Sequence, residues 1–372
     1  MSPAAASHAP PPTVAGVRTR TVLVPFARPL ATKVGYFERW PLVLIDLDTV
    51  DGPTGHAYLA PYRPEAAAAL RVLVDDLGDK LTGAPATPRA VATVAGGLRA
   101  LAGEQGLALA AQAGLDMAAW DVVAKDAGRP LAHVLGGELA PVPAYNSNGL
   151  GLNDPDTLAT ETAELIAEGG FSALKVRVGR DRPDDDLRAI RTVREAAGPD
   201  ATLVADYNQG LDLAAAIPRC AQLDGEGLAW IEEPLRYDDL DGHARLARDT
   251  TTPIMLGENF YGPKTLLEAV HHGACDLVMP DLMRIGGVTG WLAAAAMADA
   301  TRVPMSSHLY PEISSHLMAV TPTGAWLEWQ DWAHPILADP FPVRDGHVHP
   351  PNVPGNGLAW DEAAVARHLV AP

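Results

Sequence analysis

The sequence lacks the features of disulfide-rich, zinc-binding and membrane-spanning proteins. Its two cysteines, Cys220 and Cys275, form no CxxC pair, so we expect a reducing compartment and neither a disulfide framework nor a zinc ribbon. No uninterrupted apolar run reaches the ~18 residues that a membrane span requires. The first residues have neither the basic start nor the apolar core of a signal peptide. These absences predict a cytoplasmic protein that binds no membrane.

Positive charge is also scarce. The chain has 28 Lys and Arg against 46 Asp and Glu, a formal net charge of −18 over 372 residues. Nucleic acids and anionic membranes are bound by clustered Lys and Arg, so neither is an expected partner. A small anion is still compatible with this charge, because a local site can carry its own cations. Hydrophobic residues make up 48% of the chain, which is typical of a globular protein, and the length suggests about two domains.

The first part of the chain predicts a small α+β domain. Two runs that alternate apolar and polar residues, Arg18–Pro25 and Leu42–Asp48, predict strands, and Thr32–Trp40 between them predicts a bulky loop. Three stretches with helical spacing follow, namely Glu65–Leu81, Arg89–Leu101 and Leu115–Ala127. Strands followed by helices favour an α+β domain. We place it at residues 16–138, after a disordered tail at residues 1–15.

From residue 139 onward, short apolar runs alternate with helix-length segments, as in parallel strands joined by crossover helices. The eight runs are Val142–Ser147, Ser172–Val178, Thr202–Asn208, Leu228–Glu233, Pro253–Asn259, Leu277–Asp281, Pro304–His308 and Trp326–Trp329. They fall within roughly 210 residues, near the size of a (β/α)8 barrel. A doubly wound open sheet is the alternative, but no GxGxxG follows the first run. We predict an α/β barrel at residues 139–352 and a segment at 353–372 that packs back on the first domain.

Acidic side chains end three successive runs. Asp206, Glu232 and Glu258 are each 26 residues apart, the length of one strand–helix unit. Because active sites of barrels lie at the C-terminal ends of the strands, the three carboxylates would point to one place. There they would repel one another unless a cation lay among them, and all-oxygen ligands suit Mg²⁺ better than zinc. Each could instead cap the following helix, but three in register favour the metal site.

Several motifs resemble a known family. They read LDMAAWD (Leu115–Asp121), DYNQGLD, WIEEPL, GENFYGP, MPDLMRIGGVTGW and SSHLYPEISSHLMAVTP. In length and order they resemble the enolase superfamily, and in detail its mandelate racemase subgroup. The resemblance covers nearly the whole chain. It implies an N-terminal α+β capping domain over a modified (β/α)7β barrel, a homo-oligomer with an octamer as one candidate, and Mg²⁺-assisted removal of the proton α to a carboxylate.

The resemblance also assigns roles to residues around the substrate. One Mg²⁺ per subunit would lie among the three carboxylates and offset the charge that grows on an enediolate. Lys175 and Ser147 would contact the substrate carboxylate, and Asn208 the side that bears the hydroxyl. Glu328 matches a position that donates a hydrogen bond to the second carboxylate oxygen. That role requires a protonated Glu328 and therefore a raised pKa.

A base and its orienting partner end two later runs. His308 matches the general base of the family and Asp281 its partner, since a carboxylate fixes the imidazole tautomer and raises its basicity. A lone His at a strand end is more often structural, but His308 stands in the matched context PMSSHL. Glu233 directly follows Glu232, and adjacent strand residues point to opposite faces. We therefore assign Glu233 to a supporting position and not to the metal.

One residue departs from the family pattern. Racemases of the family have Lys-x-Lys on the second barrel strand, whereas this chain has Lys175 and Arg177. Arginine keeps its proton, with an unperturbed pKa above ~12, so Arg177 suits a fixed cation better than a second base. The overall resemblance favours a racemase or epimerase of a 2-hydroxy carboxylate. A single base, His308, would suffice for an acid-sugar dehydratase, and a ligand-binding protein without turnover is the third hypothesis.

Substrate choice is expected to depend on the segment Thr32–Trp40, which reads TKVGYFERW and matches the family's loop over the substrate. Its aromatic residues suit an aryl substrate, and its charged residues suit a polyhydroxy acid or a diacid. From this segment we predict Lys33 and Tyr36 as substrate contacts. Tyr62 matches a tyrosine near the substrate ring and is predicted to line the same pocket.

Overall fold

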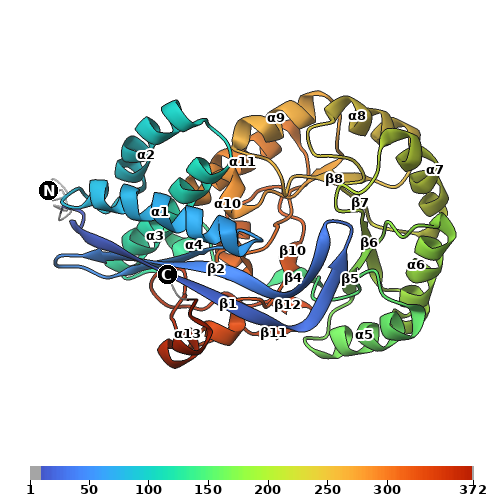
Figure 1. The fold of residues 1–372 in the computed structure, drawn as a ribbon, viewed down its shortest axis with the longest axis horizontal. Coiled ribbons are helices and arrows are strands. Elements are labelled where there is room, and N and C mark those ends of the chain that lie inside the picture. Colours follow the sequence, from blue (N-terminus) through green and yellow to red (C-terminus); the bar gives the residue numbers. More distant parts are fainter. Residues whose placement is uncertain (1–9, 371–372) are drawn as a thin grey trace, which may run out of the picture.

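The computed structural model describes residues 10–370, in which an antiparallel sheet with its helices lies beside a parallel sheet surrounded by helices (Figure 1). The antiparallel sheet has the order β1 (Val14–Thr32), β2 (Gly35–Thr49), β3 (Gly55–Leu59). The helices after it are α1 (Pro64–Leu81), α2 (Pro88–Ala102), α3 (Leu107–Asp126) and the short α4 (Leu131–Val134). The predicted α+β arrangement is confirmed, with β3 as a strand that the sequence analysis missed.

The segment Thr32–Trp40 is a strand pair and not the predicted loop. β1 and β2 form one long antiparallel hairpin that turns at residues 33–34, and its last cross-strand pair joins Thr32 to Gly35. Aromatic residues favour strands, and Tyr36 and Phe37 extend the pairing to the turn. Figure 1 shows the hairpin reaching from the first domain to the barrel, so its tip can contribute to a site there.

The first strand starts earlier than expected. β1 begins at Val14, and Thr13 forms an isolated bridge with Pro85. The disordered tail predicted at residues 1–15 therefore ends earlier than expected, because its residues 14 and 15 belong to β1. Residues 1–9 of that tail lie outside the described residues.

The barrel strands follow the predicted runs but are shorter. They are β4 (Val142–Asn146), β5 (Ala173–Arg177), β6 (Thr202–Asp206), β7 (Ile231–Glu232), β8 (Ile254–Leu256), β9 (Leu277–Val278) and β10 (Leu327–Trp329). β4 to β9 pair in parallel in chain order, and β10 also pairs in parallel with β4. The run Pro304–His308 is not a strand. Its backbone still forms hydrogen bonds to the segments on either side of it. Ser306 N donates to Val278 O (2.8 Å), and Met305 O accepts from Ala325 N (2.9 Å).

Helices lie outside the parallel strands, as Figure 1 shows. They are α5 (Pro155–Ala167), α6 (Pro183–Ala197), α7 (Leu213–Leu223), the 3-10 turn η1 (Asp224–Glu226), α8 (Leu240–Asp249), α9 (Pro263–His271), α10 (Leu282–Ile285), α11 (Gly287–Thr301) and α12 (Pro311–Met318). Asp154 and Asp212 accept hydrogen bonds from the first turns of α5 and α7 and thereby start those helices. This alternation of strands and helices confirms the predicted α/β fold.

Helix α3 is the one described helix that is long and apolar enough to cross a membrane, but 83% of its most apolar window is buried. It packs against β3, α1 and α2 in its own domain and against α10 and α11 of the barrel. A helix that is apolar on all sides is expected where every side is covered. α3 is therefore the central core helix that joins the two parts.

The last part of the chain returns to both sheets. It comprises η2 (His334–Ile336), β11 (Val343–Arg344), β12 (His347–Val348) and α13 (Glu362–His368). β12 pairs with β4 of the barrel. Beyond residue 352, Trp360 Nε1 donates to Asp46 Oδ1 (2.7 Å) and Val370 N donates to Thr21 O (2.9 Å), so this segment contacts the first domain. The domain limits at residues 138 and 352 stay predictions.

Candidate active site

Three carboxylates meet at the carboxyl ends of neighbouring strands. Asp206 ends β6, Glu232 ends β7 and Glu258 follows β8. One oxygen of each lies within 4.8 Å of the others, and all three residues are buried. The predicted spacing of one strand–helix unit therefore does bring them together. Such a set of oxygen atoms could hold a divalent cation.

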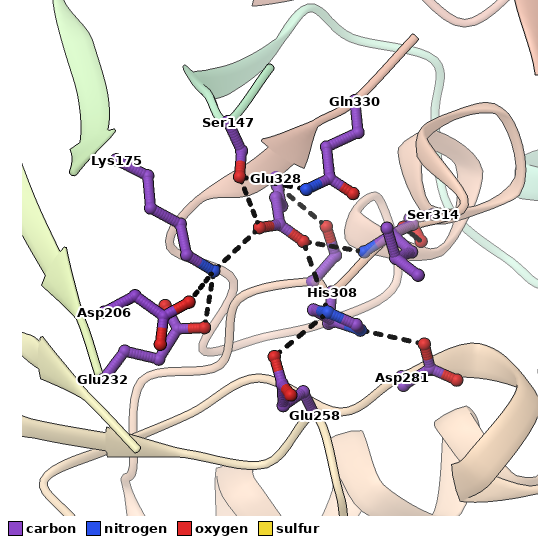
Figure 2. A network of polar contacts seen from close by, with 12 residues as sticks. Ser147, Lys175, Asp206, Glu232, Glu258, Asp281, His308, Ser314, Glu328 and Gln330 are labelled. Atoms are coloured by element: carbon purple, nitrogen blue, oxygen red, sulfur yellow. Dashed lines mark hydrogen bonds and ion pairs between the residues drawn. The ribbon is translucent and has the colours of Figure 1, made fainter. Parts of the chain in front are cut away.

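Lys175, on β5, partly neutralises this cluster. Its Nζ lies 2.6 Å from Glu232 Oε1, 3.0 Å from Asp206 Oδ2 and 3.0 Å from Glu328 Oε1, as Figure 2 shows. Burial lowers the pKa of Lys175, but the surrounding carboxylates outweigh it and hold the pKa well above its ordinary value. Lys175 is thus a permanent cation that joins the cluster to Glu328.

The metal-site carboxylates still carry more negative charge than their surroundings balance. Burial, with the neighbouring Asp206, raises the pKa of Glu232 to about 8, and burial also raises the pKa of Asp206. Burial would raise the pKa of Glu258 too, but His308 and Lys175 hold it below its ordinary value. A divalent cation fits this donor set, because it would let all three carboxylates ionise.

His308 lies between this cluster and Glu328. Its Nδ1 is 2.8 Å from Asp281 Oδ2, and its Nε2 is 3.2 Å from Glu258 Oε2 and 3.8 Å from Glu328 Oε2 (Figure 2). The other oxygen of Asp281 accepts a hydrogen bond from Arg284 N (3.0 Å) at the start of α10. Asp281 therefore caps a helix and orients an imidazole at once. Burial lowers the pKa of His308, but Glu258, Glu328 and Asp281 raise it well above its ordinary value.

Glu328, on β10, accepts hydrogen bonds and lies beside two basic side chains. Ser147 Oγ donates to its Oε1 (2.9 Å) and Leu309 N donates to its Oε2 (3.0 Å). Burial would raise the pKa of Glu328, but Lys175 and His308 lower it to about 2. Lys175 and His308 therefore favour the carboxylate form of Glu328, and the protonated form that the resemblance implies beside a bound substrate carboxylate stays a prediction.

Arg177 is fixed by acceptors at the end of the first barrel strand. Its Nη1 donates to Ser147 O and Gly149 O, both at 2.8 Å, and its Nη2 donates to Ser147 Oγ at 2.7 Å. The side chain is buried, at 3% exposure. Three donated hydrogen bonds therefore hold the guanidinium of Arg177 against the end of the first barrel strand.

Two further predicted residues contact the metal-site carboxylates. Asn208 donates from its backbone N to Asp206 Oδ1 (2.7 Å) and from Nδ2 to Asp206 Oδ2 (2.8 Å). Glu233 accepts a hydrogen bond from Asn259 Nδ2 (2.7 Å), and the same Nδ2 donates to Glu258 Oε1 (3.0 Å). Burial and nearby carboxylates raise the pKa of Glu233 well above its ordinary value. Glu233 thus contacts the metal-site residues only through Asn259.

A cavity opens between these polar groups and the β1–β2 hairpin. Lys175, Arg177, Asp206, Asn208, Glu258 and His308 line one side, and the other side is lined by Leu30, Thr32, Val34, Phe37, Trp40, Tyr62, Leu309, Gln330 and Trp332. Trp40 lies with its ring centroid 4.6 Å from that of Trp332 and 4.8 Å from that of Tyr62. The cavity is therefore polar at one end and aromatic at the other.

Lys33 and Tyr36 do not line this cavity, which corrects the predicted substrate contacts. Cross-strand partners share a face, and Leu30 pairs with Phe37 on the cavity side, whereas Tyr36 pairs with Ala31. Tyr36 is 61% exposed, and the side chain of Lys33 packs over Gly210. The alternation of side chains along a strand explains the error, because a loop was expected here.

Other cavity residues escaped the sequence analysis. Gln330 and Trp332 follow β10, which ends at Trp329, so the predicted strand runs did not include them. Leu30 would have followed from pairing the hairpin in register, and Val34 and Phe37 lie in the predicted segment Thr32–Trp40 but were not named as contacts.

Two family models match the chain. Residues 14–136 match the mandelate racemase / muconate lactonizing enzyme N-terminal domain, and residues 157–364 match the enolase C-terminal domain-like family. The chain therefore belongs to the mandelate racemase / muconate lactonizing enzyme group of the enolase superfamily, and the resemblance drawn from the motifs is confirmed.

Individual relatives extend this comparison. An enolase from alpha proteobacterium bal199, solved with bound magnesium, is 48% identical with a TM-score of 0.94, covering 96% of this chain and 99% of that one. An enolase from Bradyrhizobium complexed with magnesium and mandelic acid is 42% identical with a TM-score of 0.93, covering 98% and 100%. The L-talarate/galactarate dehydratase of Salmonella typhimurium is 34% identical over 262 residues, which is 70% of this chain and 66% of that protein's length.

Proposed function

We propose that the chain is a Mg²⁺-dependent dehydratase in which His308 alone removes the α-proton of a 2,3-dihydroxy carboxylate. The observation that carries this proposal is the pair formed by His308 and Arg177. His308 Nε2 faces the space between Glu258 and Glu328, and its Nδ1 is fixed by Asp281. A divalent cation held by Glu258 would offset the negative charge that raises the pKa of His308 and would leave Nε2 free to accept a proton. Arg177, at the position of the family's second base, is held in place by three donated hydrogen bonds, and an arginine side chain keeps its proton at ordinary pH. One base and one fixed cation suit dehydration better than racemisation.

The carboxylate of the substrate would bind where Lys175, Ser147 and Glu328 converge. Two solved relatives contain magnesium, and Mg²⁺ held by the three carboxylates would offset the negative charge that develops on the substrate. A substrate carboxylate beside Glu328 would add a negative charge there and raise the pKa of Glu328. Glu328 could then become the hydrogen-bond donor that the resemblance implies.

The residues of the chain account for each proton in the reaction. Nε2 of His308 takes the proton from C2, and the electrons of the C2–H bond form the C2=C3 double bond. The C3–O bond breaks, and the hydroxyl leaves as water with a proton from His308. The resulting enol converts to a 2-keto acid, so atoms balance as one keto acid and one water per dihydroxy acid.

Racemisation or epimerisation of a 2-hydroxy carboxylate is the second candidate. The aromatic wall formed by Phe37, Trp40 and Trp332 favours it, because an apolar substituent would fill that end of the cavity. The Bradyrhizobium relative was solved with mandelic acid, which has such a substituent and no β-hydroxyl. This reaction requires proton transfer on both faces of the α-carbon, so it needs a partner for His308.

Product analysis in D₂O tests the proposal. Wild type and His308→Asn would be incubated with Mg²⁺ and a panel of aldonic and aldaric acids, 3-phenylglycerate and mandelate, and ¹H NMR would follow products. We expect wild type to form a 2-keto acid from at least one 2,3-dihydroxy acid, and His308→Asn to form none. Loss of optical activity from mandelate without any keto acid would favour the racemase. Binding without exchange or turnover of any acid would indicate a ligand-binding protein instead.

A further inference from the structure

We propose that Gln330 and Trp40 bind the β-hydroxyl of the substrate, so that the substrate is a 2,3-dihydroxy carboxylate whose remaining substituent is apolar. This inference rests on the proposed function and adds the substrate class. Gln330 is 4% exposed and Trp40 is 2% exposed. Both line the cavity beside His308. Trp40 ends the segment that was predicted to select the substrate, whereas Gln330 was not predicted.

The hydrogen bonds of Ser147 fix the orientation of the Gln330 amide. Ser147 Oγ gives its one hydrogen to Glu328 Oε1 (2.9 Å) and accepts from Arg177 Nη2 (2.7 Å). Its remaining neighbour, 3.1 Å away, must therefore be the Nε2 of Gln330 and not the carbonyl oxygen. Figure 2 shows this amide beside Ser147 and Glu328.

This orientation leaves one acceptor without a partner. Gln330 Oε1 is buried and has no hydrogen bond within the described residues. The indole Nε1 of Trp40 is likewise a buried donor that lacks a partner there. A buried polar atom normally has a partner, so two unpaired atoms of opposite kind in residues that line the same cavity need an explanation. A hydroxyl group supplies it, because it can donate to Gln330 and accept from Trp40.

The chain also limits where that hydroxyl lies. Oε1 belongs to the same amide as the Nε2 that contacts Ser147, and Ser147 contacts Glu328 at the carboxylate end of the cavity. The hydroxyl must therefore be close to the carboxylate. The α-hydroxyl is expected near Asn208, which leaves the β-hydroxyl for Gln330. In the proposed dehydration this is the group that departs.

The rest of the substituent faces apolar side chains. A second hollow adjoins the first and shares Trp40, Leu309, Gln330 and Trp332 with it. Its other lining residues are Leu42, Tyr58, Ala60, Tyr310, Pro311 and Ala333. The described lining of this hollow offers no charged side chain. This lining suits an apolar remainder better than a chain of further hydroxyls.

Binding measurements with two matched acids test this inference. 3-Phenylglycerate carries a β-hydroxyl and 3-phenyllactate lacks it, and calorimetry with Mg²⁺ measures the affinity of each without requiring turnover. We expect wild type to bind 3-phenylglycerate about tenfold or more tightly, because a site built to bond a hydroxyl rejects the analogue without it. Gln330→Met should reduce this preference to about twofold or less, and Trp40→Phe should reduce it partly.

The affinity ratio separates recognition from structural damage. Loss of the Gln330 contact to Ser147 would weaken both acids alike and leave the ratio unchanged. Val72→Ala, at an exposed position of α1 that is not among the residues lining the cavity, is the control and should keep the wild-type ratio. Melting curves would confirm that each variant folds, and if Gln330→Met does not fold, Trp40→Phe provides the test.

The outcomes distinguish this inference from the proposed function. Equal binding of the two acids by wild type, or a preference that both Gln330→Met and Trp40→Phe retain, would overturn the inference alone, provided that His308-dependent keto-acid formation is observed. No binding, exchange or dehydration of any 2-hydroxy acid would overturn the proposed function and this inference with it.

Discussion

Replacing Asp281 with Asn should disable His308 while leaving the surrounding fold intact. Asp281 Oδ1 accepts from Arg284 N at 3.0 Å, and Oδ2 contacts His308 Nδ1 at 2.8 Å. In Asp281→Asn the amide oxygen must remain at Arg284, since an amide nitrogen cannot accept that hydrogen. The amide NH₂ then faces His308 and forces Nδ1 to act as an acceptor. The imidazole proton moves to Nε2, the atom that should receive the α-proton.

The size of the effect follows from this change of tautomer. The same Asp-to-Asn exchange beside a catalytic histidine in a serine protease lowers kcat about 10⁴-fold. We expect a fall of about 10³- to 10⁴-fold in α-proton exchange, equal to about 4 to 5.5 kcal/mol in the barrier. The helix cap is kept, so the melting temperature should stay within about 3 °C of wild type, a change of less than about 1 kcal/mol.

The assay is α-proton exchange in D₂O with Mg²⁺, followed by ¹H NMR for wild type and variant. Asp212→Asn is the matched control, because Asp212 caps α7 through Ala215 N and is not among the residues that line the cavity. It should exchange at the wild-type rate. If Asp281→Asn retains exchange within about tenfold of wild type, then Asp281 does not set the tautomer of His308 and this reasoning fails.

Three further changes test the site and the contact between the two domains. Arg284→Met removes the donor to Glu258 O (2.8 Å) and should weaken Mg²⁺ binding about tenfold or more by calorimetry; unchanged affinity would contradict this. Arg177→Lys restores a titratable amine and should add slow α-proton exchange of the second mandelate enantiomer, which NMR would detect. Burial raises the pKa of Asp116 to about 7, so the folded chain binds the proton more tightly than the unfolded chain. Asp116 should therefore lower stability progressively from about pH 4 to pH 7, and Asp116→Asn should flatten that part of the melting-temperature profile.

The barrel and the metal-site carboxylates were predictable because both depend on periodic features. Apolar runs alternating with helix-length segments locate parallel strands, and a constant interval between acidic residues puts them on successive strand ends. The strand limits are less regular than the runs suggest. The backbone of Pro304–His308 forms hydrogen bonds to the segments on either side of it, but the run is not a strand. Whether such a run becomes a regular strand depends on tertiary contacts.

The substrate end of the site was harder to predict for two physical reasons. Which side of the hairpin faces the cavity depends on register, and one step separates Phe37 inside from Tyr36 outside. The protonation of Glu328 depends on Lys175 and His308, which reach it from distant parts of the chain. Neither the register nor this charge balance is a local property of the sequence.

The central claim is that His308 is the only base of the site. The most direct test is ¹H NMR of wild-type protein in D₂O with Mg²⁺, with each enantiomer of mandelate added separately. The account predicts that the α-proton of one enantiomer exchanges, that the other persists, and that His308→Asn exchanges neither. Exchange of both enantiomers by wild type, with loss of optical activity, would show that Arg177 or another group acts as a second base and would contradict the account.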